Sequence, residues 1–217
     1  MPESHREYLG ESCWDLLCRL APLKHRNSGT TLLRQGDDAT SVILLEHGNV
    51  MVTAHGPHGA EELLAVRGSG EILGEMAVLT NGRRSATVRT LEPCRVRVVT
   101  AAKFSDLVDE HDLLRRLLQH SYSRIRESDR TKLELATGSV ALRLASLLSR
   151  LADTAATDGP VRIQLPQEDL ARLIGASRNA VGRALKEWSG HGWLTTSAGG
   201  GLTVTNLAAL RSHAATA

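Results

Sequence analysis

The chain has 217 residues, enough for one large domain or two small ones. Hydrophobic residues make up 41 % and charged residues 23 %, as in an ordinary folded protein, whereas aromatic residues make up only 3 %, so aliphatic side chains must fill the core. The formal net charge of +2 is too small to indicate nucleic-acid binding by itself, and no apolar run approaches the length of a membrane span.

The N-terminal segment has no basic start followed by an apolar core, so we expect a cytoplasmic protein without a membrane partner. A short amphipathic helix is predicted over residues 13–20, ending before Pro22. The three cysteines, Cys13, Cys18 and Cys94, are odd in number and scattered, which does not suggest a disulfide framework. We expect buried or idle thiols and no bound metal.

Between residues 30 and 100, short apolar runs alternate with turn residues. Glycines mark the breaks: Gly36, Gly48, Gly56, Gly59, Gly68 and Gly70. This alternation is typical of a compact all-β sandwich or barrel.

Two helices are predicted next, a short one around residues 104–108 and a long one from about residue 112 to 136. Alternating spacings of four and three along the long helix indicate a coiled-coil seam: Leu114, Leu118, Ser121, Ile125, Ser128, Lys132 and Leu135. The polar members weaken this seam, so the alternative is an amphipathic helix packed on its own β-rich domain. Gly138 then interrupts the helix and is the predicted hinge.

Beyond Gly138, another amphipathic helix is predicted over residues 140–152, then a polar loop over 154–159 and a short strand over 161–165. Residues 194–204 predict a hairpin that turns at Gly199, Gly200 and Gly201.

Two short helices joined by a tight turn are predicted between this strand and the hairpin. Apolar residues at helical spacing end at Gly175, which suits the left-handed backbone of such a turn. Ser177 can cap the second helix by accepting from its first free amides. Val181, Ala184 and Leu185 form the inward stripe of that helix.

The outer face of the second helix carries Arg178, Asn179, Arg183 and Lys186. Arginine can bond to guanine O6 and N7, and asparagine to adenine N6 and N7, whereas Lys186, further along, is better placed for phosphate. Residues 162–186 hold five basic and two acidic residues, a mild nucleic-acid footprint. The alternative is an ordinary helical hairpin with a solvated basic face.

The run Ser177-Arg178-Asn179-Ala180-Val181-Gly182-Arg183 resembles the recognition helix of the cyclic AMP receptor and fumarate-nitrate regulator (Crp/Fnr) family, which reads Ser-Arg-x-x-Val-Gly-Arg. The resemblance implies that Arg178, Asn179 and Arg183 contact base edges, and Ser177 is predicted to bind DNA with them. Asn179 stands where the cyclic AMP receptors carry glutamate. Because an amide both donates and accepts, we expect a half-site that differs at that base pair.

Residues 70–90 resemble the phosphate-binding cassette of cyclic-nucleotide domains, in which Gly-Glu precedes a short helix and Arg-Ser/Thr-Ala follows it. The residues that this assigns to the cyclic nucleotide are Gly74, Glu75, Met76, Ala77, Arg84 and Ser85. Free amides of the short helix and Arg84 would hold the phosphate, Ser85 would add a hydroxyl, and Glu75 would accept from the ribose 2′-hydroxyl. One alternative is that Glu75 and Arg84 are solvated turn residues. Another is that they pair with each other in a cassette that has lost its ligand, and a third is that the cassette takes another effector.

The adenine-contacting pair of the cyclic AMP receptors falls on Ser128 and Asp129. The carboxylate of Asp129 can accept from the adenine amino group and disfavours a guanine carbonyl, so we expect cAMP rather than cyclic GMP. The same charge is also compatible with an altered or vacant site. The resemblance further pairs Arg124 with Glu75.

Together these features predict an α+β protein with an N-terminal cyclic-nucleotide-binding β-roll (1–110), a long dimerisation helix (111–137) and a C-terminal winged helix-turn-helix (138–217). The implied function is a homodimeric transcriptional regulator that binds double-stranded DNA at a palindromic operator under the control of cAMP. A contact with RNA polymerase is left open, and no catalytic motif supports an enzyme. The alternative of another class is a cyclic-nucleotide-binding module that regulates a protein partner.

Overall fold

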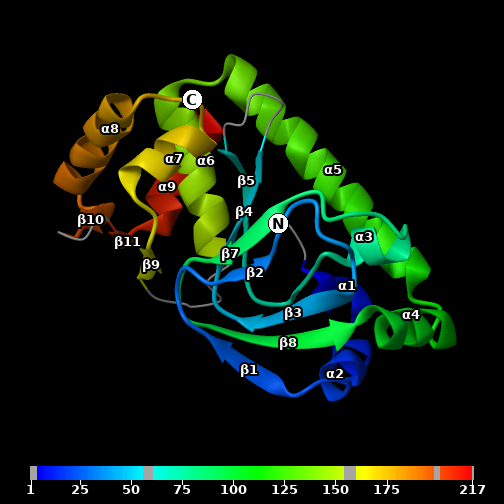
Figure 1. Cartoon of the computed structure of the whole chain (residues 1–217). Helices are drawn as coiled ribbons and strands as arrows, with labels where there is room; N and C mark the ends of the chain where they lie inside the picture. The colour runs from blue at the N-terminus through cyan, green and yellow to red at the C-terminus, as the bar shows by residue number, and fades with distance from the viewer. Residues whose placement is uncertain (1–3, 56–60, 154–159, 198–200, 217) are drawn as a thin grey trace. The chain divides into compact units, whose positions relative to one another are not determined.

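The computed structural model describes residues 4–55, 61–153, 160–197 and 201–216, which divide into two compact units with the boundary between Glu127 and Ser128. Several predicted turn positions lie outside the described residues, namely Gly56, Gly59, Gly199, Gly200 and the loop 154–159. Figure 1 labels the elements along the chain. Within the described ranges, no helix combines the length and the apolar composition that a membrane span requires.

The first unit contains two four-stranded antiparallel sheets, with the strand orders β1-β8-β3-β6 and β2-β7-β4-β5 (Figure 1). Their strands are β1 (Leu23–Arg26), β2 (Thr31–Leu33), β3 (Ser41–His47), β4 (Val50–His55), β5 (Glu61–Arg67), β6 (Glu71–Leu73), β7 (Thr87–Thr90) and β8 (Cys94–Thr100). The predicted all-β region is confirmed, although it begins earlier than residue 30 because β1 pairs with β8.

Strand β3 is buried on both faces, and this explains its unbroken apolar run. Successive side chains of a strand point to opposite faces. Val42 and Leu44 belong to one apolar cluster, which includes Phe104, whereas Ile43 and Leu45 belong to the cluster between the sheets. The second cluster is the interior of the β-roll, and the first joins the roll to its helices.

The helices of this unit are α1 (His5–Leu9), α2 (Glu11–Arg19), α3 (Glu75–Leu79), α4 (Ala101–Glu110) and the first part of α5 (Leu114–Thr137). Helix α2 was predicted and α1 was not. Ser4 caps α1 with a capping box, in which its hydroxyl accepts from the amide of Glu7 and the Glu7 carboxylate accepts from the Ser4 amide. Only Gly10 separates α1 from α2. Helix α1 was missed because five residues are too few for a helical periodicity to be recognised in the sequence.

The second unit holds the end of α5 and the elements α6 (Val140–Asp153), β9 (Val161–Ile163), α7 (Gln167–Leu173), α8 (Arg178–Gly190), β10 (Leu194–Thr196), β11 (Leu202–Val204) and α9 (Leu207–Thr216). Its three strands form an antiparallel sheet in the order β10-β11-β9. The break between α5 and α6 falls at Gly138 and Ser139, as predicted, and the Ser139 hydroxyl accepts from the amide of Leu142 at 3.1 Å.

Candidate functional site

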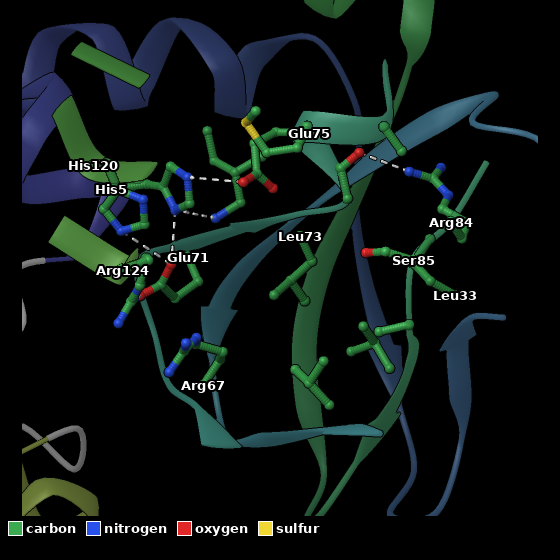
Figure 2. A pocket seen from close by; sticks show the side chains of 17 residues that line it. His5, Leu33, Arg67, Glu71, Leu73, Glu75, Arg84, Ser85, His120 and Arg124 are labelled. Atoms are coloured by element: carbon green, nitrogen blue, oxygen red, sulfur yellow. Dashed lines mark hydrogen bonds and ion pairs between the residues drawn. The ribbon is translucent and has the colours of Figure 1, made fainter. Parts of the chain in front are cut away.

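A cavity of about 240 Å³ opens in the first unit between the two sheets, α3 and α5 (Figure 2). All six cassette residues that the sequence singles out in this unit line it: Gly74, Glu75, Met76, Ala77, Arg84 and Ser85. Five further polar residues, which the sequence reasoning did not assign to a ligand, also line it: His5, Arg67, Glu71, His120 and Arg124.

Arg84 is a buried cation at one side of this cavity, with 5 % of its surface exposed. Its Nη1 donates to the carbonyl of Gly74 at 2.8 Å, and its Nη2 donates to the carbonyl of Ser41. Among the described residues, no carboxylate lies within ion-pair distance of the guanidinium, and burial lowers the pKa of Arg84. The neighbouring Ser85 is exposed. A site that holds a positive charge against neutral oxygens is suited to an anion.

Gly74 is the residue that allows Arg84 to reach this position. It has φ +82°, in the left-handed region, and begins α3 as the N-cap residue. A Cβ at Gly74 would lie 2.3 Å from Nη1 of Arg84 and 2.9 Å from Leu33. Glycine therefore meets two requirements here, the backbone conformation and the close approach of the guanidinium.

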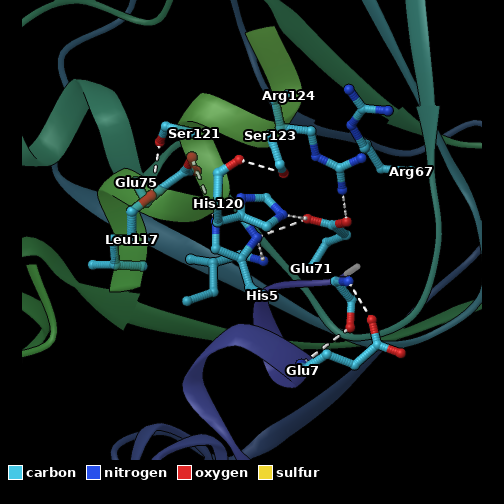
Figure 3. Close-up of polar contacts among 12 residues, drawn as sticks. His5, Glu7, Arg67, Glu71, Glu75, Leu117, His120, Ser121, Ser123 and Arg124 are labelled. Carbon is cyan, nitrogen blue, oxygen red and sulfur yellow. Dashed lines mark hydrogen bonds and ion pairs between the residues drawn. The ribbon is translucent and has the colours of Figure 1, made fainter. Parts of the chain in front are cut away.

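The predicted pair between Arg124 and Glu75 is not formed. Arg124 instead makes an ion pair with Glu71 on β6 (Figure 3). It also donates to Glu127 at 2.9 Å. Glu75 lies beside His5, with 3.6 Å between Oε1 and the ring Nε2. The prediction was wrong because β6 places a second carboxylate, four residues before Glu75, between Arg124 and the cassette.

Glu71 is the centre of a buried polar cluster that also contains His5, His120 and Arg124 (Figure 3). Its Oε2 is 2.7 Å from Nδ1 of His5 and 3.6 Å from Nε2 of His120. Burial, and then the charge of His5, lowers the pKa of His120 to about 3. Burial, and then Arg67, also lowers the pKa of Arg124. No local sequence pattern indicates this cluster, because its members come from α1, β6 and α5.

Helix α5 has two different faces in the first unit. Leu113, just before the helix, and Leu117 are buried at 2 % and 1 % exposure, whereas Leu114, Leu118 and Ile125 are 46 %, 51 % and 59 % exposed. The buried face packs on the β-roll, as the alternative interpretation predicted. The exposed apolar stripe contains residues of the predicted seam, and its role in dimerisation stays a prediction.

Ser128 and Asp129 lie in α5 beyond the unit boundary, and both are exposed. The structure therefore describes them as surface residues of the second unit. Their assignment to a nucleotide remains a prediction.

The predicted helix-turn-helix is confirmed by α7 and α8. Gly175 in the turn has φ +58°, and the Ser177 hydroxyl accepts from the Ala180 amide at 3.2 Å and caps α8. Val181 and Leu185 are buried, as expected of the inward stripe. The remaining predicted DNA-binding residues are all exposed on α8: Arg178, Asn179, Arg183 and Lys186.

Arg143 on α6 is a residue that the sequence reasoning missed. Its Nη1 donates to the carbonyl of Ile174 at 2.8 Å, at the point where α7 ends and the turn begins. The contact ties the turn to α6, and the orientation of α8 depends on that turn. The hairpin predicted over residues 194–204, the wing of the winged helix-turn-helix, is present as β10 and β11, which pair with Leu194 opposite Val204.

Comparison with known proteins identifies two domains in the chain, a cyclic nucleotide-binding domain and a helix-turn-helix domain. The family model for the cyclic nucleotide-binding domain matches residues 23–111, and the model for the Crp-like helix-turn-helix domain matches residues 142–213. The cAMP-activated global transcriptional regulator CRP of Haemophilus influenzae is 30 % identical over 163 residues, 72 % of each chain.

Two solved structures share the fold over almost the whole chain. FixK2 from Bradyrhizobium japonicum matches with a TM-score of 0.76 at 18 % identity, covering 91 % of this chain and 98 % of its own. The c-di-GMP responsive global regulator CLP from Xanthomonas campestris matches with a TM-score of 0.70 at 22 % identity, covering 90 % of this chain and 99 % of its own.

Proposed function

Since the chain belongs to the Crp/Fnr family of transcriptional regulators, we propose that it is a homodimer that reads a palindromic operator under the control of cAMP bound in the β-roll. The proposed division of labour is a sensor over residues 1–110, a dimerisation helix over 111–137 and a DNA-binding domain over 138–217. The protein would act in the cytoplasm, as a regulator rather than an enzyme.

The observation that carries the ligand half of this proposal is Arg84. A guanidinium with 5 % exposure and only backbone carbonyls as described partners is a costly arrangement unless an anion completes it. A cyclic phosphodiester supplies one negative charge and two free oxygens at this point. Ser85 and the backbone amides of Met76 and Ala77 would bond to the same phosphate, and Glu75 would accept from the ribose hydroxyl.

Two features favour cAMP within this class. The cavity of about 240 Å³ is smaller than most ligand pockets, which suits one nucleotide better than a cyclic dinucleotide of twice the bulk. The relative from Haemophilus influenzae is described as cAMP-activated. We further propose that Ser128 and Asp129 complete the site at the adenine, where the Asp129 carboxylate selects an amino group over a carbonyl.

The DNA half rests on the exposed N-terminal part of α8. A recognition helix presents its first residues to base edges in the major groove, and Arg178 and Asn179 directly follow the cap. Arg183 lies one and a half turns later and would reach a base edge as well, whereas Lys186 would contact phosphate. In a dimer the two α8 helices would need a separation of roughly 34 Å to read both half-sites together.

A control mechanism follows from these two halves. Nucleotide bound by the cassette and by α5 would favour one arrangement of the dimer helices about Gly138, and both recognition helices would then reach DNA at once. The coupling required is on the order of 1–3 kcal/mol, the usual size for an allosteric effector.

Calorimetric titration of the full chain with cAMP, cyclic GMP and c-di-GMP tests the ligand. We expect saturable binding of cAMP, weakened at least tenfold by Arg84→Lys, because lysine keeps the charge and loses the planar pair of donors. The matched control is Arg83→Lys, since Arg83 is the neighbouring arginine but points into solvent with 73 % of its side chain exposed. Saturation by cyclic GMP or c-di-GMP alone would overturn the choice of effector.

Selection of bound DNA from random sequence, followed by anisotropy titrations, tests the operator. Arg183→Ala should reduce the free energy of binding to the selected site by about 1–3 kcal/mol and relax the preference at one base pair. Lys186→Ala should weaken binding to all sequences alike and reduce the slope of log affinity against log salt concentration by about one. DNA binding without any sequence preference would instead favour a module that regulates a protein partner.

A further inference from the structure

A trio of buried side chains lines the cavity on the side away from Arg84 and Ser85 (Figure 2). His5 on α1, Glu71 on β6 and His120 on α5 have side-chain exposures of 3 %, 6 % and 2 %. One donor atom from each residue lies within 4.8 Å of the donor atoms of the other two. Two imidazoles and a carboxylate converge here, and the nucleotide chemistry proposed above uses none of them.

The trio is poorly satisfied by the protein alone. Both ring nitrogens of His120, and Nε2 of His5, are buried without a hydrogen-bond partner. Nδ1 of His5 faces two groups with opposite requirements, the amide of Ile72 at 3.2 Å and Oε2 of Glu71 at 2.7 Å. A proton on Nδ1 serves the carboxylate but opposes the amide N–H, whereas a lone pair on Nδ1 does the reverse. A metal ion held by Nδ1 and Oε2 would use a lone pair of each.

We propose that His5, Glu71 and His120 bind one divalent first-row transition-metal ion, with Zn²⁺ as the reference case. Ligand nitrogens and oxygens about 2.0–2.2 Å from a tetrahedral zinc ion lie about 3.3–3.6 Å from each other. The separation of 3.6 Å between Oε2 of Glu71 and Nε2 of His120 fits this range, whereas the 2.7 Å between Oε2 and Nδ1 of His5 would have to lengthen.

The groups around the trio match those that support metal ligands in proteins. A ligating histidine usually donates its second ring N–H to a carboxylate, and Nε2 of His5 lies 3.6 Å from Oε1 of Glu75. The other oxygen of Glu71, Oε1, is held by Arg124, which leaves Oε2 for the ion. Three protein ligands leave a fourth position, and the cavity is where a water or ligand atom would occupy it.

Binding would part the two imidazole rings. Their centroids are 3.5 Å apart with an interplanar angle of 34°, whereas two imidazoles on one tetrahedral ion hold their centroids roughly 5 Å apart. Because His5 is carried by α1 and His120 by α5, binding of the ion would change the spacing between these two helices. The ion would thus link the start of the chain to the helix proposed for dimerisation.

The donor set also selects the kind of metal. Imidazole nitrogens with one carboxylate suit Zn²⁺, Ni²⁺, Co²⁺ or Fe²⁺, whereas Ca²⁺ and Mg²⁺ require a shell of oxygens. The sequence reasoning expected no metal, since His5 and Glu71 are 66 residues apart and no ligand spacing reveals the site.

The test uses the full chain after chelator treatment, without nucleotide or DNA, so that its outcome is independent of the proposed function. Titration with Zn²⁺ against a chromophoric chelator should give one tight site per chain. We expect at least a hundredfold loss of affinity in His5→Gln and in His120→Gln, and no change in the control His111→Gln, which alters an exposed histidine of the same unit.

Co²⁺ spectra of the wild-type protein provide a second measurement that does not depend on how the variants fold. Visible bands of a four-coordinate nitrogen and oxygen site, without a sulfur charge-transfer band, would support the proposal. Absence of a stoichiometric site in the wild type, unchanged affinity in folded His5→Gln, or a sulfur band that assigns the ion to Cys13 or Cys18 would each overturn it.

Discussion

The guanidinium of Arg124 on α5 forms an ion pair with the carboxylate of Glu71 on β6, and their side chains are only 18 % and 6 % exposed. Through this pair the helix proposed for dimerisation is bonded directly to a strand next to the nucleotide cassette. A change at the cassette therefore has a short route to α5 that does not require Glu75. The pair is also the part of the site that differs from what the family resemblance implies.

Glu71→Gln should destabilise the first unit by about 2 kcal/mol. Removing one partner of a buried ion pair typically costs ~3–5 kcal/mol, and the loss is smaller here because Glu127 still accepts from Arg124. Urea unfolding in the presence of a chelator, followed by circular dichroism, measures the change. Glu11→Gln is the control, because its pair with Arg6 is exposed and its removal should leave the midpoint unchanged. Equal midpoints for both variants would contradict a structural role for the buried pair.

Gly74→Ala should reduce the affinity for cAMP at least tenfold. The new Cβ would lie 2.3 Å from Nη1 of Arg84, and the shift that relieves this contact moves the guanidinium proposed to bind phosphate. Gly29→Ala separates this effect from backbone strain, since Gly29 has a similar φ of +76° but nothing within 4 Å of the added atom. Calorimetry on both variants measures the difference, and an equal loss of affinity would assign the effect to strain alone.

Leu118→Glu should convert the dimer to a monomer without unfolding the chain. Leu118 is 51 % exposed in the isolated chain, so a charge there is tolerated by the monomer but not in an apolar seam. Sedimentation velocity measures the oligomeric state, and Gln119→Glu provides an exposed neighbour outside the seam as the control. A wild-type protein that sediments as a monomer, or a variant that remains dimeric, would exclude α5 as the interface.

Substitutions of Ser177 separate the helix cap from the DNA contact. Ser177→Ala removes the acceptor for the Ala180 amide and should lower stability by about 1 kcal/mol, whereas Ser177→Asp preserves the cap. Both variants should bind the operator more weakly. Alanine removes the cap that orders the start of α8, and aspartate places a negative charge against the phosphates. Thermal unfolding and anisotropy are the two measurements. Undiminished operator binding by Ser177→Asp would show that Ser177 does not lie near the backbone of DNA.

The thiols of Cys18 and Cys94 should resist alkylation at pH 8. Burial raises the pKa of each to about 11, with nearby Glu46 and Glu92 adding to the effect. A raised pKa means less thiolate at a given pH, so both rates should be more than a hundredfold below those of the denatured chain and should rise about tenfold per pH unit up to pH 11. Site-resolved mass spectrometry after iodoacetamide treatment measures them. Equal rates in the native and denatured states would show that these cysteines are accessible.

The sequence alone was sufficient for the features that depend on neighbouring residues. Ser177 and Gly175 mark a cap and a turn because capping and left-handed backbone are local requirements, and the structure confirms both. The motif around Arg84 could be found from the sequence because the cassette is a continuous stretch of chain, and the structure places Arg84 at a cavity. The helical spacing of Leu118 and Ile125 likewise predicted one exposed apolar face of α5.

Only the tertiary structure decided which distant side chains meet. Arg124 and Glu71 are 53 residues apart, and the choice of Glu71 over Glu75 depends on the pairing of β6 with β3 and on the packing of α5, which no local pattern records. His5 reaches the same carboxylate from 66 residues away because an unpredicted helix carries it there. Periodicity and capping act within a few residues, whereas ion pairs and buried clusters arise where the folded chain brings separate segments into contact.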